Sequence, residues 1–249
     1  MQSSWVSCPQ RRPDAVVRLI CIPHAGGGAA SFHPLAALLP PTIEVLSIQL
    51  PGRETRLAER PHTRMRPLIE ELADAVMGIT TRQYAFFGHS MGALISFELS
   101  RELRRRGCNL PRLLVASGRR APTVPHTEPP LHPLPDDAFV GELVRRYDAI
   151  PQVILQEPEL MALFIPVLKA DFAVFETHQH AGEPPLACAA ALYGGRDDPQ
   201  TEQMDGWTDL FTGPVRRRLF DGGHFYLGNQ RQALASALAE DVLTPVPAE

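Results

Sequence analysis

The sequence contains few cysteines, and those it has are far apart. They are Cys8, Cys21, Cys108 and Cys188, with no CxxC pair and no spacing typical of metal ligands. Two of them lie inside apolar, strand-like stretches, where cysteine behaves as a small hydrophobic residue. We therefore expect free thiols, a reducing cytoplasmic compartment and no bound metal.

The chain also lacks any apolar run of membrane-spanning length. Its first 17 residues, "MQSSWVSCPQRRPDAVV", have no apolar core of the kind found in signal peptides. The net charge of −4 argues against nucleic acid as the main partner. What is present is 249 residues, 44% of them hydrophobic, enough for one large core. We expect a soluble, monomeric protein with a single domain over residues 1–249.

Six short, mostly apolar stretches predict strands: 16–22, 43–50, 84–88, 112–118, 188–194 and 215–220. Continuous apolar runs bounded by glycine or proline suit strands that are covered on both faces, as in a parallel sheet. Helical periodicity marks 67–79, 91–106 and 232–243, and Gly107 is suited to end the second of these helices. Strands alternating with helices predict an α/β fold with a mostly parallel sheet.

The segment between residues 118 and 188 is longer than one helical connection between neighbouring strands needs. It begins with the proline-rich passage "APTVPHTEPPLHPLP" and continues with two helix-like stretches, 136–150 and 157–178. We interpret residues 121–185 as an insertion that forms a helical lid over a pocket. The alternative is an additional packed layer of helices.

Ser90 lies in "YAFFGHSMGA", between an apolar run and an amphipathic stretch. The G-x-S-x-G pattern between a strand and a helix is that of a nucleophile elbow, in which the serine occupies a sharp turn. Gly88 and Gly92 remove Cβ atoms that such a turn would bring into collision. The helix that follows would direct its free N–H groups at the reacting centre. We predict that Ser90 is a nucleophile.

A serine nucleophile needs a base, and the base needs a carboxylate to orient it. His224, in "LFDGGHFYL" after the last predicted strand, is the candidate base, whereas His89 should point elsewhere from its place on the turn. Asp197 and Asp198 follow the preceding strand, and the order serine, acid, histidine is that of the nucleophile-elbow hydrolases. The Asp-Pro junction favours Asp198, with Asp197 as the alternative.

A tetrahedral intermediate also needs an oxyanion hole. One donor would be the backbone N–H of Met91, which follows the serine, and the other that of Ala25 in the glycine-rich loop "CIPHAGGGAASF". The same loop could instead bind a phosphate or a dinucleotide. However, no Gly-Lys-Ser/Thr follows it, and the G-x-G-x-x-G spacing fails at Ser31.

Six stretches together resemble one family, the stand-alone type II thioesterases of polyketide and nonribosomal peptide synthesis. They are "PHAGGGAASF", "LPGRETRLAE", "FGHSMGA", "LKADFAVFET", "YGGRDDP" and "DGGHFYL", in that order from residue 23 to 227. The resemblance implies an α/β-hydrolase fold with a helical lid. It also implies hydrolysis of acyl groups from the phosphopantetheine arm of acyl or peptidyl carrier proteins, with no cofactor besides that arm.

The resemblance also implies roles for individual residues. The catalytic serine, acid and base match Ser90, Asp198 (or Asp197) and His224, and the oxyanion donors match the N–H groups of Met91 and Ala25. Two positions depart from the family pattern, since Lys169 stands where arginine is usual and His178 where tyrosine is expected. Both lie in the predicted insertion, so they affect the expected acyl preference and not the chemistry.

Apolar residues of the predicted lid could line an acyl pocket or could simply pack the lid: Phe139, Leu143, Phe164, Leu168, Phe172 and Phe175. Carrier proteins are usually acidic, so arginines could dock them. Arg104–Arg106 are one possibility, although positive charge at the end of a helix is favourable anyway. Arg119 and Arg120, just after a strand, are better placed for docking near an entrance.

Three other functions remain open from the residues alone. The first is a general carboxylesterase or lipase, which the replacement of the usual HGGG motif by "PHAGGG" disfavours. The second is a releasing or cyclising thioesterase domain of a synthase, and the third is a non-catalytic binding protein with the same fold.

Overall fold

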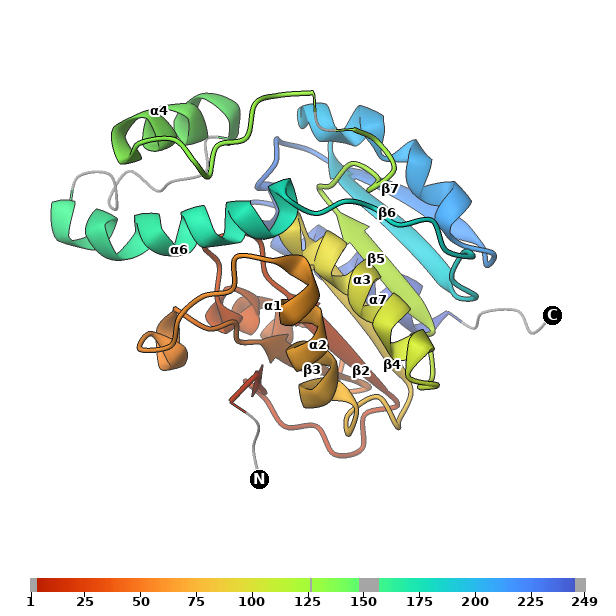
Figure 1. Cartoon of the computed structure of the whole chain (residues 1–249). Helices are drawn as coiled ribbons and strands as arrows, with labels where there is room; N and C mark the ends of the chain where they lie inside the picture. Colours follow the sequence, from red (N-terminus) through yellow and green to blue (C-terminus); the bar gives the residue numbers. More distant parts are fainter. Residues whose placement is uncertain (1–3, 126, 148–156, 245–249) are drawn as a thin grey trace.

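A computed structural model describes residues 4–125, 127–147 and 157–244 and has a central sheet of seven strands (Figure 1). These strands are β1 (Val6–Ser7), β2 (Val17–Ile22), β3 (Ile43–Ile48), β4 (Tyr84–His89), β5 (Leu113–Ser117), β6 (Ala189–Gly195) and β7 (Val215–Phe220). Their order across the sheet is β1-β3-β2-β4-β5-β6-β7. Only β1 runs antiparallel to its neighbour, and all other pairs are parallel. The predicted α/β fold with a mostly parallel sheet is confirmed.

Six helices accompany the sheet in the described part of the chain. They are α1 (His33–Leu38), α2 (Met65–Val76), α3 (Met91–Arg105), α4 (Asp136–Tyr147), α6 (Pro158–Glu176) and α7 (Arg231–Leu243). Helices α2 and α3 pack together on one face of the sheet, and α1 and α7 cover the other. Because helices cover both faces, the inner strands are mostly apolar, and all six residues of β4 are buried.

The six predicted strands and the three predicted helices are all present, with ends that differ by a few residues. Gly107 ends α3 with a φ of 70°, a left-handed conformation that glycine adopts without a Cβ clash. Two short elements were not predicted. The two-residue strand β1 and the six-residue helix α1 are too short for a periodic pattern to show.

Helices α4 and α6 lie between β5 and β6, inside the segment 121–185 that the sequence singles out. Figure 1 shows α6 crossing one end of the sheet, with α4 beyond it. The two helices are joined by an ion pair of 2.7 Å between Lys169 and Asp136 and by the edge-to-face rings of Phe139 and Phe172. The end of the predicted stretch 136–150 lies outside the described residues.

Candidate active site

Ser90 forms the turn between β4 and α3. Its backbone has φ 54° and ψ −115°, which lies outside the regions that non-glycine residues usually occupy. The N–H of Ser90 donates a hydrogen bond of 2.8 Å to the carbonyl of Ser117 at the end of β5, which ties the turn to the sheet. Strain of this kind persists where the surrounding structure enforces it, and it is common at functional sites.

The two glycines around Ser90 are required by close backbone contacts. A Cβ at Gly88 would overlap the carbonyl of Gly92, and a Cβ at Gly92 would overlap the carbonyl of Ile22 in β2. The collisions therefore come from the first turn of α3 and from the neighbouring strand. Because neither backbone can move without disturbing the sheet, both positions need glycine.

His224 and Asp198 form a hydrogen-bonded pair. His224 Nδ1 lies 2.8 Å from Asp198 Oδ2, and the two side chains are only 7% and 2% exposed. The second carboxylate oxygen accepts the N–H of Gln200 at 3.0 Å. An ionised carboxylate only accepts hydrogen bonds, so the proton of the neutral imidazole lies on Nδ1 and leaves Nε2 free to take another.

Asp197 does not contact the imidazole. Its side chain is exposed, and its backbone N–H donates to the carbonyl of Gly222 at 3.0 Å. This bond joins the loop after β6 to the loop after β7, where Gly222 has φ 114°. The join brings Asp198, the next residue, against His224. The sequence favoured Asp198 and kept Asp197 as the alternative, and in the structure it is Asp198 that is hydrogen-bonded to the imidazole.

The His224 imidazole lies beside the turn, with its ring centre 5.1 Å from that of His89, the residue before Ser90. Ser90 Oγ makes no hydrogen bond with any residue that the structure describes. Burial lowers the pKa of His89 well below its usual range and that of His24 to about 4, so both rings are neutral near pH 7. His89 Nδ1 is also held by Ser117 Oγ at 2.9 Å, which leaves His224 as the candidate base.

One backbone N–H group at the Ser90 turn and one in the glycine-rich loop are free in the described part of the chain. Those of Met91 and Ala25 have no hydrogen-bond partner among residues 4–125, 127–147 and 157–244. Met91 is the first residue of α3, where N–H groups have no partner within the helix. Ala25 begins the glycine-rich loop after β2. These are the two donors that the sequence predicted for an oxyanion hole.

Other N–H groups of the glycine-rich loop are already bonded to acidic side chains. The N–H of Gly26 donates to Asp171 at 2.7 Å, and that of Ala30 donates to both oxygens of Glu54 at 3.3 Å. A phosphate would have to displace two carboxylates to use them. The loop is therefore poorly suited to the phosphate-binding alternative that the sequence left open.

Asp171 joins the glycine-rich loop to helix α6. Besides accepting the N–H of Gly26, it forms a two-pronged ion pair with Arg53, with N–O distances of 2.6 and 2.8 Å. Both side chains are buried. Sequence analysis assigned no function to either residue, although each lies in a stretch that carried the family resemblance, "LPGRETRLAE" for Arg53 and "LKADFAVFET" for Asp171.

A comparison of the sequence with models of known protein families covers nearly the whole chain. A family model described as the thioesterase domain matches residues 17–242. The chain belongs to the thioesterase family. The match spans every strand except β1 and contains Ser90, Asp198 and His224.

Relatives of this thioesterase agree in sequence and in structure. The gramicidin S biosynthesis protein GrsT of Aneurinibacillus migulanus is 40% identical over 215 residues, 86% of this chain and 84% of that protein. Thioesterase PikA5 of Streptomyces venezuelae is 36% identical over 96% of this chain and 85% of its own length. The solved structure of BorB, a type II thioesterase from the borrelidin biosynthetic cluster, superposes with a TM-score of 0.88 at 34% identity, covering 97% of this chain and 99% of that one. The predicted α/β-hydrolase fold and thioester hydrolysis are confirmed.

The apolar residues predicted for the lid of the thioesterase fall into two groups. Phe164 and Leu168 touch the glycine-rich loop, since a Cβ at Gly26 would lie 2.9 and 2.8 Å from them. The others, Phe139, Leu143, Phe172 and Phe175, are buried, and the ring of Phe172 contacts those of Phe139 and Phe175. Tyr147, at the end of α4, was not predicted, yet its ring centre lies 5.7 Å from that of His224.

The two departures from the family pattern have partners in the thioesterase fold. Lys169 pairs with Asp136 of α4, as described above, and so helps to fix the distance between the two helices of the insertion. His178 Nε2 lies 3.2 Å from Glu98 of α3. Neither side chain contacts the Ser90 turn, in agreement with the expectation that they do not take part in the chemistry.

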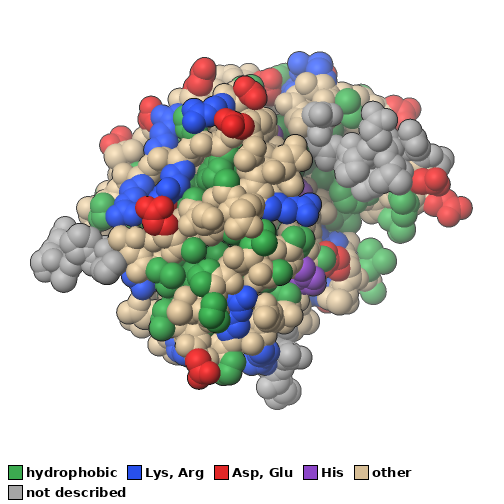
Figure 2. Space-filling view, turned by 180° about the vertical axis from the view of Figure 1, so that it is seen from behind, with side chains coloured by type: hydrophobic (Ala, Val, Ile, Leu, Met, Phe, Trp, Pro, Cys, Tyr) green, Lys and Arg blue, Asp and Glu red, His purple; other side chains and the backbone are tan. Residues whose placement is uncertain are grey.

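Most of the arginines predicted to dock a carrier protein form ion pairs with acidic side chains of this chain. Arg104 and Arg105 pair with Glu183, and Arg106 pairs with Glu102. Arg119 is only 6% exposed, so it does not offer a docking surface, contrary to the prediction. On the face of the molecule seen in Figure 2, Lys and Arg side chains form several separate groups, with acidic side chains among them.

Other expectations concern the whole thioesterase. All four cysteines are free, as predicted. Within the described residues, no cluster of His, Cys, Asp and Glu could hold a metal ion. None of the helices that the structure describes is long and apolar enough to cross a bilayer.

Proposed function

We propose that this thioesterase hydrolyses acyl groups from the phosphopantetheine arm of acyl or peptidyl carrier proteins and so removes stalled or aberrant chains during polyketide or nonribosomal peptide synthesis. The observation that carries the proposal is the His224–Asp198 pair beside the strained Ser90 turn, in a chain that belongs to this family. The relatives named for biosynthetic pathways support the substrate class. The free thiols are in keeping with a cytoplasmic setting.

The proposed reaction has two steps. Ser90 Oγ attacks the thioester carbonyl while its proton passes to His224 Nε2. The C–S bond then breaks, and the departing sulfur takes that proton from His224, so that pantetheine leaves as a thiol. Water, deprotonated by His224, then attacks the acyl-serine ester and releases the free acid and Ser90. Asp198 holds the imidazole in the right tautomer and stabilises its positive charge. No cofactor is needed beyond the arm that the substrate carries.

The oxyanion formed in each step would accept hydrogen bonds from the N–H groups of Met91 and Ala25. Preorganised donors of this kind are among the largest contributions to acyl-transfer catalysis. A thiolate is a good leaving group, so stabilising the oxyanion and binding the arm matter more than protonating the leaving atom. Phe164 and Leu168, which lie against the loop, are the lid residues that we place nearest the acyl chain.

A hydrolysis panel tests the substrate class. The same acyl group is presented on a carrier protein, on a small thiol and as a p-nitrophenyl ester, with short and long acyl chains. We expect the largest kcat/KM on the carrier protein, because the arm and the carrier add binding contacts. Equal rates on the carrier and on the small thiol would contradict carrier specificity, and a preference for the oxygen ester would favour a carboxylesterase.

Asp171 gives a second prediction, because it holds the loop that supplies the Ala25 donor. Asp171→Leu combined with Arg53→Met removes the buried ion pair without leaving one charge unpaired, which is often tolerated in folding. We expect kcat to fall by about 10- to 100-fold, since the Gly26 N–H loses its acceptor and the neighbouring donor is misplaced. KM should change much less, because the acyl pocket remains.

The control is the thermal unfolding midpoint of the double variant, compared with that of Asp171→Leu alone, which leaves Arg53 buried and uncompensated. If the double variant regains stability but not kcat, Asp171 acts by positioning the oxyanion loop. If kcat returns together with stability, its role is only structural.

A further inference from the structure

Arg119 and Arg120 follow β5 directly and are unusual among the arginines near the site. Neither guanidinium makes a hydrogen bond or an ion pair with any residue that the structure describes. Arg119 is 6% exposed, with its Cζ 4.6 Å from the ring centre of Phe175, and Arg120 is half-buried. By contrast, Arg145 and Arg146 nearby both bind Glu142. Unpaired charges in such surroundings cost free energy unless an anion joins them.

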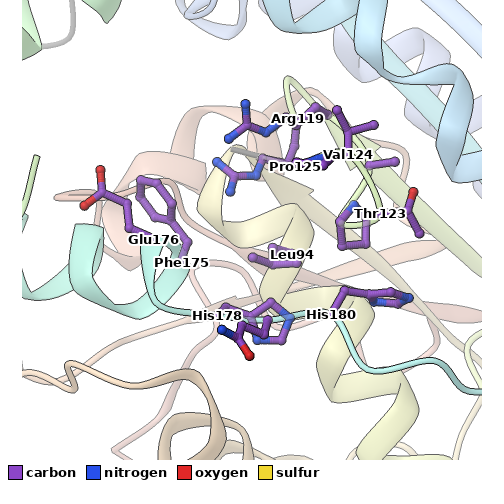
Figure 3. Close-up of a pocket in the computed structure, with 13 residues that line it drawn as sticks. Leu94, Arg119, Thr123, Val124, Pro125, Phe175, Glu176, His178 and His180 are labelled. Carbon is purple, nitrogen blue, oxygen red and sulfur yellow. The ribbon is translucent and has the colours of Figure 1, made fainter. Parts of the chain in front are cut away.

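The two arginines lie between two cavities. The first, of about 410 Å³, is seen in Figure 3, with Arg119 on one side and His178 and His180 on the opposite side. The second, of about 530 Å³, is lined by the same two arginines and also by Asp198 and His224. An occupant of the second cavity would therefore contact both the arginines and the proposed base.

The acidic side chains in these cavities form no hydrogen bond or ion pair with the two arginines. Three of them have another partner: Glu176 with His132, Glu128 with Arg146 and Asp198 with His224. The fourth, Asp197, is exposed to solvent. Burial, helped by the charge of Arg120, lowers the pKa of Arg119 to about 10, so its guanidinium is still charged at neutral pH. The wall shared by the cavities thus carries net positive charge.

We propose that Arg119 and Arg120 bind an oxyanion of the substrate, either a carboxylate on the acyl chain or the phosphate of the pantetheine arm. The inference rests on the proposed function, because the substrate is what brings the anion into the cavity. Guanidinium groups match the spacing of two oxygens on a carboxylate or a phosphate. Since Arg119 is buried, only a chain or a small group that enters the cavity reaches it, which excludes the surface of a carrier protein.

The test uses two pairs of thioesters that differ in charge. One pair is an acyl-pantetheine and the matching acyl-phosphopantetheine; the other is an ω-carboxyacyl thioester of N-acetylcysteamine and the ω-methyl acyl thioester of equal length. We expect a higher kcat/KM for the anionic member of at least one pair, and that pair identifies the source of the anion. Arg120→Gln should reduce the preference by about 10- to 100-fold while the rate on the neutral member stays near wild type.

Arg66→Gln is the matched control, since it removes the same charge from an exposed residue of α2 that is paired with Glu70. Arg120 is chosen over Arg119 because its side chain is less buried, and the unfolding midpoint of Arg120→Gln checks that the fold is kept. An equal preference for neutral and anionic substrates in both pairs, or the same loss in Arg66→Gln, would overturn the proposal.

A binding measurement separates this proposal from the proposed function. Isothermal titration with free phosphopantetheine and with a dicarboxylate measures anion binding without turnover. Binding by the wild type that Arg120→Gln weakens supports the site, even if no thioester is hydrolysed. Failure of the wild type to bind either anion overturns it, even if the protein hydrolyses neutral thioesters well.

Discussion

Ser90→Ala is expected to lower kcat for thioester hydrolysis by about 10⁴-fold or more, because it removes the nucleophile and leaves only the oxyanion donors and binding contacts. The substitution should not destabilise the fold. Ser90 Oγ has no hydrogen-bond partner among the described residues, and alanine carries the same Cβ at φ 54°. The measurement is single-turnover hydrolysis of an acyl-carrier protein, compared with the unfolding midpoint of each protein.

A covalent probe provides the control for this prediction. A fluorophosphonate should label the wild type at Ser90 and leave Ser90→Ala unlabelled. The variant should still bind the acyl-carrier protein, since the pocket and the arginines are intact. If Ser90→Ala kept most of its activity, or if the probe labelled a different serine, the proposed mechanism would be wrong.

The parts of the fold that could be predicted from the sequence are those with a long, regular pattern. The strand before Ser90 is an apolar run bounded by glycine, and α3 repeats its apolar residues at helical spacing over fifteen residues. Such patterns arise because each of these elements buries one or both of its faces, and the buried positions are occupied by apolar residues. A two-residue strand such as β1, or a helix of fewer than two turns such as α1, buries too few residues to leave a periodic pattern.

The proposed catalytic residues could be predicted because the G-x-S-x-G turn and the chain order serine, acid, histidine leave local signals in the sequence. For the choice between Asp197 and Asp198 the sequence offered one local signal, the Asp-Pro junction, whereas the structure distinguishes them through a hydrogen bond from Asp197 to Gly222 in another loop. The same holds for Asp171, whose partner Arg53 is 118 positions away in the chain. Contacts of this kind depend on how segments that are distant in the chain pack together in the fold. A single sequence does not show that packing.

The burial of Arg119 is a further example. Its position after a strand suggested an accessible charge near an entrance. In the fold, the ring of Phe175 in α6 packs against the Arg119 guanidinium. Helix α6 therefore helps to bury a side chain that the end of β5 alone would leave exposed. A segment inserted between two strands can bury residues that would otherwise be exposed. Its own hydrophobic periodicity does not show where it packs on the rest of the fold.

The adjacent aspartates allow a sharp test of the acid that orients His224. Asp198→Asn should lower kcat by about 10⁴-fold, because an amide can present its NH₂ group to Nδ1 and so favour the tautomer with the proton on Nε2. In that tautomer the imidazole cannot accept the proton of Ser90. Asp197→Asn, which makes the same chemical change one residue away on an exposed side chain, should leave kcat near the wild-type value.

Both variants keep nearly the same side-chain volume, so their unfolding midpoints can be compared directly with their rates. The variant Asp198→Asn should also lose its reactivity toward the fluorophosphonate, since that reaction depends on the same base. A large loss in Asp197→Asn together with normal activity in Asp198→Asn would reverse the assignment. That result would mean that the loop after β6 rearranges in solution, because in the structure only Asp198 reaches the imidazole, at 2.8 Å.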